Sequence, residues 1–136
     1  MYRPLRRGFH GGHSLRKVIA LMGILSLVAC TLTTDAPRPQ VLAITGGEDQ
    51  ETPVNTALPN PLGVIVIDQY GFAMTGITVT WVITSGGGML SATSTQTDEN
   101  GSASVTYTAG PTAGTATITA TVAGIGTLTF NETITP

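Results

Sequence analysis

The chain has 136 residues, of which 41% are hydrophobic and 10% are charged, with a formal net charge of −2. This length provides one small domain with a single core. Five of the six basic residues precede Cys30 and all eight acidic residues follow it, so the chain after Cys30 has one Arg, no Lys and a formal charge of −7. That charge excludes binding to a row of nucleic-acid phosphates and electrostatic docking on an anionic membrane.

Residues 1–29 have the composition of an export signal. Basic residues come first, the apolar run from Val18 to Ala29 follows, and small residues precede Cys30. Twelve apolar residues form a helix too short to cross a bilayer comfortably. The alternative is a short buried helix of the folded domain, but the bases before the run and the Thr- and Pro-rich stretch after it argue against that. Arg6 and Arg7 also match the core of a twin-arginine signal, so the export route stays open.

Cys30 is the only cysteine in the chain. The residues Leu27-Val28-Ala29-Cys30 resemble the lipobox of bacterial lipoproteins, and the resemblance implies that Cys30 is acylated and becomes the first residue of the mature chain. A single cysteine cannot form an intramolecular disulfide, so use as an acyl acceptor also accounts for its presence. Ordinary signal cleavage that leaves an unused cysteine is the alternative. The resemblance implies an exported protein, anchored by lipid to the bacterial cell envelope. Thr31, in place of the Asp of inner-membrane retention, favours the outer membrane if the host has one.

Residues 30–40 are expected to form the lipidated cysteine and a flexible tether. They include two prolines and show no hydrophobic periodicity. Ten residues extend at most about 35 Å, so the domain that follows is held close to the membrane surface.

Residues 41–136 are expected to form an all-β domain. Apolar and polar residues alternate around Val79 and Trp81, again around Val105 and Tyr107, and again from Ala116 to Val122. Residues 62–67 are continuously apolar, as expected of a central strand. Gly- and Asp-containing turns separate these segments at spacings of about ten residues, a pattern typical of a β-sandwich. The expectation is a sandwich of about seven to nine short antiparallel strands.

Five segments carry a family resemblance when they are taken in order. They are Leu-Pro-Asn-Pro-Leu at 58–62, Val-Ile-Asp-Gln-Tyr-Gly at 66–71, Gly-Ile-Thr-Val-Thr-Trp at 76–81, three glycines at 86–88, and Thr-Asp-Glu-Asn-Gly-Ser-Ala at 97–103. Together they resemble the bacterial immunoglobulin-like domain of the invasin and intimin type (group 1), from about residue 44 to 134. The resemblance implies an Ig-like Greek-key sandwich with a non-catalytic, structural or adhesive role toward a protein at the cell surface. A second copy of these segments is absent, so this chain alone cannot build a long rod.

The inventory of reactive groups leads to the same exclusion of catalysis. The chain after Cys30 has neither His nor Lys, so its serines lack a base and zinc lacks nitrogen ligands. We therefore expect no enzyme activity, cofactor or metal. A hydrolase built on a carboxylate pair is the unlikely alternative, drawn from Asp68, Asp98, Glu99 and Glu132. A weak calcium site at 98–101, or around Glu48, Asp49 and Glu51, also stays open, although a structural turn and solvated side chains explain these acids better.

Aromatic residues are the remaining candidates for binding. Trp81, Tyr107 and Phe130 lie in inward rows and are expected in the core. Tyr70, Phe72 and Met74 follow an Asp-x-x-Gly turn on a connection expected to be wet, so they form an interaction patch if they are exposed together. The alternative is that Tyr70 and Met74 fold onto the end of the sheet. Exposed, coplanar aromatics would instead support a carbohydrate-binding accessory module, for which a glycan surface is the partner.

Overall fold

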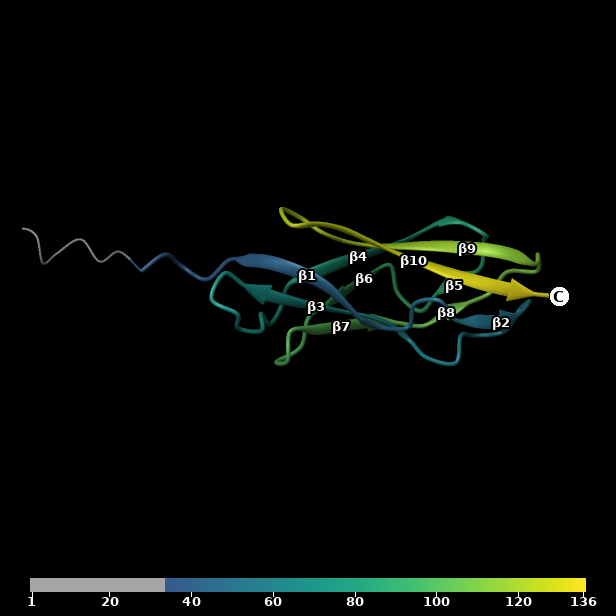
Figure 1. Ribbon diagram of the computed structural model, residues 1–136, viewed down its shortest axis with the longest axis horizontal. Helices are drawn as coiled ribbons and strands as arrows, with labels where there is room; N and C mark the ends of the chain where they lie inside the picture. Colours follow the sequence, from purple (N-terminus) through teal and green to yellow (C-terminus); the bar gives the residue numbers. More distant parts are fainter. Residues whose placement is uncertain (1–33) are drawn as a thin grey trace, which may run out of the picture. The chain divides into compact units, whose positions relative to one another are not determined.

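The expected strands are present and pack as two facing sheets (Figure 1). The computed structural model describes residues 34–136, and residues 37–136 form one compact unit. Residues 1–33 are not described, so the predictions for the signal segment 1–29 and for Cys30 lie outside the described residues. The strands are β1 (Pro39–Gly46), β2 (Glu51–Pro53), β3 (Leu62–Asp68), β4 (Thr78–Ser85), β5 (Met89–Leu90), β6 (Ser94–Gln96), β7 (Ser102–Val105), β8 (Tyr107–Thr108), β9 (Gly114–Val122) and β10 (Gly126–Thr135). Residues 34–136 contain no apolar helix of membrane-spanning length.

One sheet has the order β1-β3-β7 and the other the order β2-β10-β9-β4-β6, while β5 and β8 form a separate two-stranded pair. All pairs are antiparallel except β2 with β10, which is parallel. The all-β Ig-like fold expected from the sequence is confirmed. The described residues form ten strands, more than the seven to nine expected. Thr106 divides one expected strand into β7 and β8, and β2, β5 and β6 are short strands of three residues or fewer.

The core lies between the two larger sheets and follows the alternation of the sequence. In β4, Val79 and Trp81 are buried while Thr80 between them is exposed, and in β9 every second residue from Ala116 to Val122 is buried. The Trp81 and Phe130 rings lie with centroids 5.9 Å apart and planes inclined by 38°. The indole N–H of Trp81 donates to Thr95 Oγ1 at 2.8 Å, so its polar atom has a partner despite burial.

The turn that joins β6 to β7 owes its form to one carboxylate. Asp98 Oδ1 accepts hydrogen bonds from the backbone N–H groups of Asn100 at 2.9 Å and Ser102 at 3.0 Å. Gly101 has φ +73°, and a Cβ there would lie 2.6 Å from the carbonyl oxygen of Val66. This position therefore requires glycine both for its conformation and for its close approach to β3.

Candidate functional sites

The turn after β3, residues 68–72, is fixed in shape by the side chain of Asp68. Its Oδ1 atom accepts hydrogen bonds from the backbone N–H groups of Tyr70 at 2.8 Å and Phe72 at 2.9 Å. The backbone closes the same turn, since Asp68 N–H donates to Phe72 O and Gly71 N–H donates to Asp68 O. Asp68 itself is buried, and Gly71 has φ +88°. The side chains at the tip are therefore displayed from an ordered turn.

The structure separates the three residues of the predicted patch. Phe72 is 69% exposed and Tyr70 is 48% exposed. Met74 is half-buried and packs against the core, because its N–H donates to Val66 O and its carbonyl accepts from the Thr97 hydroxyl. Tyr70 and Phe72 are thus available at the surface, whereas Met74 belongs largely to the end of the sheet. Whether this turn binds a partner stays a prediction.

The same turn stands where the polypeptide enters the domain. The N–H of Arg38 donates to the Gln69 side-chain carbonyl at 2.8 Å, and Pro39 lies opposite Asp68 in the β1–β3 ladder. The start of β1 and the turn after β3 therefore share one end of the domain (Figure 1). Any anchor upstream of Arg38 is therefore connected to the domain at this end.

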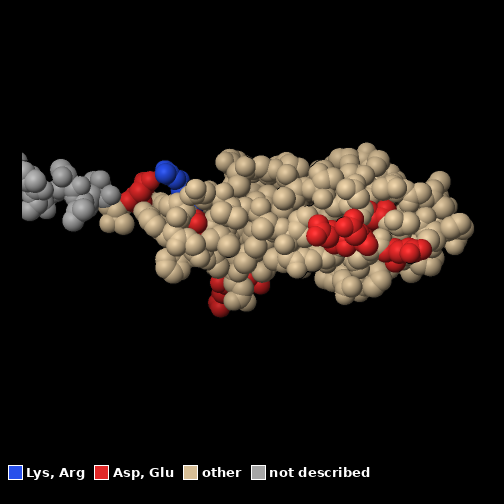
Figure 2. All heavy atoms as spheres, viewed as in Figure 1, with Lys and Arg blue, Asp and Glu red and all other residues tan. Residues whose placement is uncertain are grey.

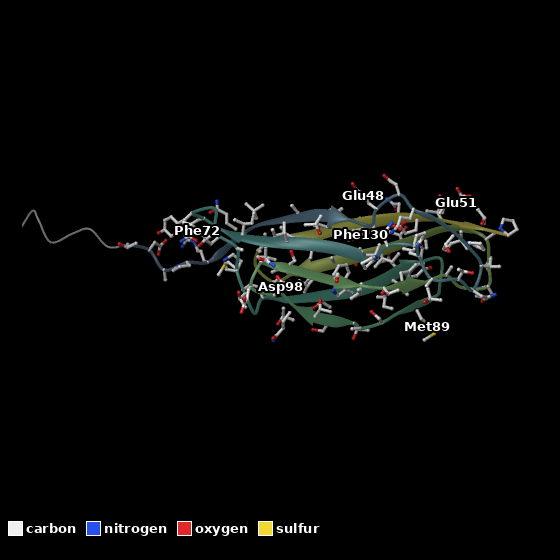
Figure 3. All side chains as sticks on the ribbon, turned by 90° about the horizontal axis from the view of Figure 1, so that it is seen from below. Glu48, Glu51, Phe72, Met89, Asp98 and Phe130 are labelled. Atoms are coloured by element: carbon white, nitrogen blue, oxygen red, sulfur yellow. The ribbon has the colours of Figure 1, made fainter. Side chains whose placement is uncertain are left out.

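A second exposed apolar surface lies at the other end of the domain. Met89 is 71% exposed and Val82 is 48% exposed. They border a shallow groove of about 500 Å³ whose other lining residues include Thr80, Ile83, Leu90 and Ser94. Met89 and Phe72 lie at opposite ends of the domain (Figure 3). This groove was not predicted from the sequence, because it depends on β5 leaving the edge of β4 and no periodicity indicates that path.

The least expected feature is a carboxylate inside the core. Glu132 occupies the inward row of β10 between Phe130 and Ile134 and has an exposed fraction of 0%. Its Oε2 atom accepts a hydrogen bond from the backbone N–H of Gln50 at 2.7 Å. Its Oε1 atom is buried and has no hydrogen-bond partner among the described residues. The sequence did carry a signal for this position, since Glu132 stands two residues after Phe130 in the alternating pattern.

The surroundings of Glu132 disfavour its charge. Burial raises the pKa of the Glu132 carboxyl to about 7, the hydrogen bond from Gln50 opposes that rise, and the negative charges of Asp49 and Glu48 add to it. Acidic side chains are visible over this part of the domain in Figure 2, and no blue side chain lies among them. Burial also raises the pKa of the nearby Tyr107 hydroxyl, which donates to Gly87 O at 2.7 Å.

The loop over Glu132 is held in place by Gln50. The amide nitrogen of its side chain donates to Gly47 O at 2.7 Å and Asn60 O at 2.9 Å, and its side-chain oxygen accepts from Asn60 N–H. The backbone of Gln50 meanwhile accepts from Thr133 N–H. Since these bonds fix both sides of residue 50, its N–H group stays directed at the Glu132 carboxylate.

The remaining candidates from the sequence occupy structural positions. Within residues 34–136, no group of three His, Cys, Asp or Glu side chains is placed to hold a metal ion. Trp81, Tyr107 and Phe130 are buried, which confirms their assignment to the core. Among the described residues, the exposed aromatic side chains are those of Tyr70 and Phe72.

This arrangement defines an Ig-like β-sandwich module, and the comparisons with known proteins give its family. The family model for the bacterial Ig-like domain (group 1) matches residues 43–135. The chain belongs to the bacterial Ig-like domain (group 1) family. The comparison with curated proteins finds no match.

Solved structures with a similar fold come from S-layer proteins and adhesins. Domains 4 and 5 of the S-layer protein SbsC match at 19% identity with a TM-score of 0.57, over 76% of this chain and 55% of that one. The adhesin InvE of Yersinia pseudotuberculosis matches at 17% identity with a TM-score of 0.59, over 72% and 32%. The C-terminal 282-residue fragment of intimin, in complex with the intimin-binding domain of the translocated intimin receptor, matches at 22% identity with a TM-score of 0.53, over 71% and 33%. This chain therefore spans between about a third and about half of these solved chains, and identities this low establish the fold alone.

Proposed function

We propose that this protein is a non-catalytic, lipid-anchored module of the bacterial cell surface, with a structural or adhesive role toward another protein. The observation that carries the proposal is the order of its parts. A cysteine in a lipobox-like sequence stands only eight residues before Arg38, at which the Ig-like domain begins its contacts. Such an arrangement holds one folded domain close to a membrane. The lipid anchor would lie in the outer membrane if the host has one.

The relatives support a role in contacts between proteins. SbsC is a surface-layer protein, InvE is an adhesin, and the intimin fragment was solved with a receptor domain bound. The extension of that role to this chain is an analogy at the level of the fold. The chemistry supports it too, because the carboxylates of Asp68 and Asp98 are used in turns and Glu132 is enclosed in the core.

Replacing the anchor residue tests the proposal directly. The Cys30→Ala variant of the full chain is expected to leave the membrane fraction, because its mature chain would lack any acyl group. The measurement is fractionation of a bacterial host that expresses each form, followed by mass spectrometry of the Cys30 peptide extracted from membranes. The matched control is Thr31→Ala, which leaves the cysteine in place and should fractionate as the wild type does. An unmodified Cys30, or a Cys30→Ala variant that still fractionates with membranes, contradicts lipid anchoring.

The nature of the partner needs a separate experiment. Residues 31–136 are expected to retain a protein partner from the cell surface and to give no signal on a glycan array, since the large aromatic rings other than Tyr70 and Phe72 are buried in the described domain. Met89→Ser and Phe72→Ser, at opposite ends of the domain, should show which end carries the contact. Binding to a glycan by the wild type, abolished by Phe72→Ser, would support the carbohydrate-binding alternative instead.

A further inference from the structure

We propose that the turn with Tyr70 and Phe72 rests on the surface of the anchoring membrane, with Phe72 inserted among zwitterionic lipids. This inference depends on the proposed anchoring at Cys30 and specifies which end of the domain meets the bilayer. Its starting point is the distribution of exposed apolar residues. Val41, Tyr70 and Phe72 are three of the five large hydrophobic side chains exposed among the described residues, and all three belong to the start of β1 or the adjoining turn.

The connection to the anchor determines how far this turn can be from the lipid. Arg38, whose N–H donates to the Gln69 side chain in the turn, lies eight positions after Cys30. At full extension the segment from Cys30 to Arg38 spans about 28 Å, whereas the headgroup region of one leaflet is roughly 5–8 Å thick, so the turn reaches the lipid surface only when the tether is partly folded back. Met89, by contrast, lies toward the end of the domain opposite Phe72 (Figure 3). Of the two exposed apolar surfaces, the one with Phe72 is therefore the one that a short tether brings within reach of the bilayer.

The chemistry of the turn fits a lipid surface. Tyr is among the residues enriched at membrane interfaces, and Phe adds apolar area that can enter the acyl boundary. The turn is already ordered by the two hydrogen bonds to Asp68 Oδ1, so little conformational entropy is lost when its side chains insert. Two aromatic residues are too few to bind a membrane from solution. Attached to an anchor, however, they act at a high effective concentration.

Charge selects the kind of lipid. Arg38 is the basic residue beside the turn, but the neighbouring turn after β6 carries the exposed side chains of Asp98 and Glu99. Gly101 of that turn lies against Ala73, so both acids are close to the Phe72 end. Anionic headgroups would be repelled there, whereas zwitterionic headgroups would not.

The test uses the single cysteine of the chain. Residues 30–136, which contain the compact unit 37–136 with its own core, are coupled through Cys30 to a maleimide lipid in phosphatidylcholine vesicles. Because this attachment does not depend on acylation in the cell, its result is independent of the fractionation experiment. Two variants report position: Phe72→Trp at the tether end and Met89→Trp at the far end. Trp81 is buried and contributes the same background to both.

We expect the emission of Phe72→Trp to move to shorter wavelength and to be quenched by spin-labelled lipids once the protein is attached, while Met89→Trp keeps its solvent emission. Amide hydrogen exchange at residues 70–73 should also slow on vesicles for the wild type but not for Phe72→Ser, whose melting temperature should match the wild type because Phe72 is exposed. Solvent-like emission of attached Phe72→Trp overturns the inference. A shift that appears only when a cell-surface protein is added also overturns it, and assigns the turn to protein docking.

Discussion

Replacing Glu132 by Gln is expected to make the domain more stable at pH 8 and to remove most of its loss of stability between about pH 4.5 and 7. The wild-type carboxyl has a pKa of about 7 in the folded domain against an ordinary value of 4.5. Below pH 4.5 it is protonated in both states. As the pH rises to 7, the unfolded state gains the ionised form and the folded state does not, so the free energy of unfolding falls. Above pH 7 the difference stays constant.

The size of this effect follows from the shift in pKa. Each unit corresponds to about 1.4 kcal/mol, so the whole window represents about 3 kcal/mol, a large fraction of the stability of a small domain. The Gln side chain keeps an oxygen to accept the Gln50 N–H bond and carries no charge to bury. The measurement is the free energy of unfolding from denaturant titrations at several pH values. A control is Glu51→Gln, an exposed side chain of the neighbouring strand.

Two results would contradict this account of Glu132. One is a wild-type stability that rises with pH across the same window. The other is a Glu51→Gln variant that flattens the pH dependence as much as Glu132→Gln does, because the effect would then come from the general negative charge of the loop rather than from the buried carboxyl. Stability of Glu132→Gln close to that of the wild type at pH 4.5, together with a clear gain at pH 8, is the pattern that burial of an ionisable group predicts.

The alternation of apolar and polar residues predicted the core well. Successive side chains of a strand point to opposite faces of the sheet, so the buried face can be recognised from local sequence alone. Trp81, Tyr107 and Phe130 were placed correctly in this way. The same alternation runs on to Glu132, two residues after Phe130, but its burial was not predicted, because a carboxylate in the core is costly. What decided its position was the loop at Gln50, a contact between residues 82 apart in the chain that the pattern of β10 does not contain.

The location of Phe72 could not be predicted for a similar reason. The sequence indicated an exposed turn, and the hydrogen bonds to Asp68 are local. That this turn lies beside the entry of the chain depends on the pairing of Pro39 with Asp68, which is set by the register of β1 on β3. The groove beside Met89 likewise depends on the pairing of β5 with β8 rather than with β4. Residues that bear on function thus occupy places determined by long-range pairing, whereas the core follows from local periodicity.

The second large effect is expected at Trp81, the largest buried side chain. Trp81→Ala should lower the free energy of unfolding by about 3–5 kcal/mol, because it removes the ring packed on Phe130 and leaves a cavity between the sheets. Thr95→Val should cost less, about 1–3 kcal/mol, since it leaves the packing intact and deprives one buried indole N–H of its acceptor. Circular dichroism during thermal and urea unfolding is the suitable measurement, because Trp81 is the only tryptophan of the chain.

The order of these costs separates packing from hydrogen bonding as the source of stability at this position. Trp81→Phe retains an aromatic ring against Phe130 and also removes the N–H donor, so it should fall between the wild type and Trp81→Ala. If Thr95→Val were as damaging as Trp81→Ala, the hydrogen bond to β6 would hold the sheet edge, and the packing of Trp81 would be secondary. If Trp81→Ala cost less than about 1 kcal/mol, the two sheets would have to close over the lost ring, which dense interiors resist. The inward rows of β4 and β10, which flank β9 in one sheet, would then not form the core of this domain.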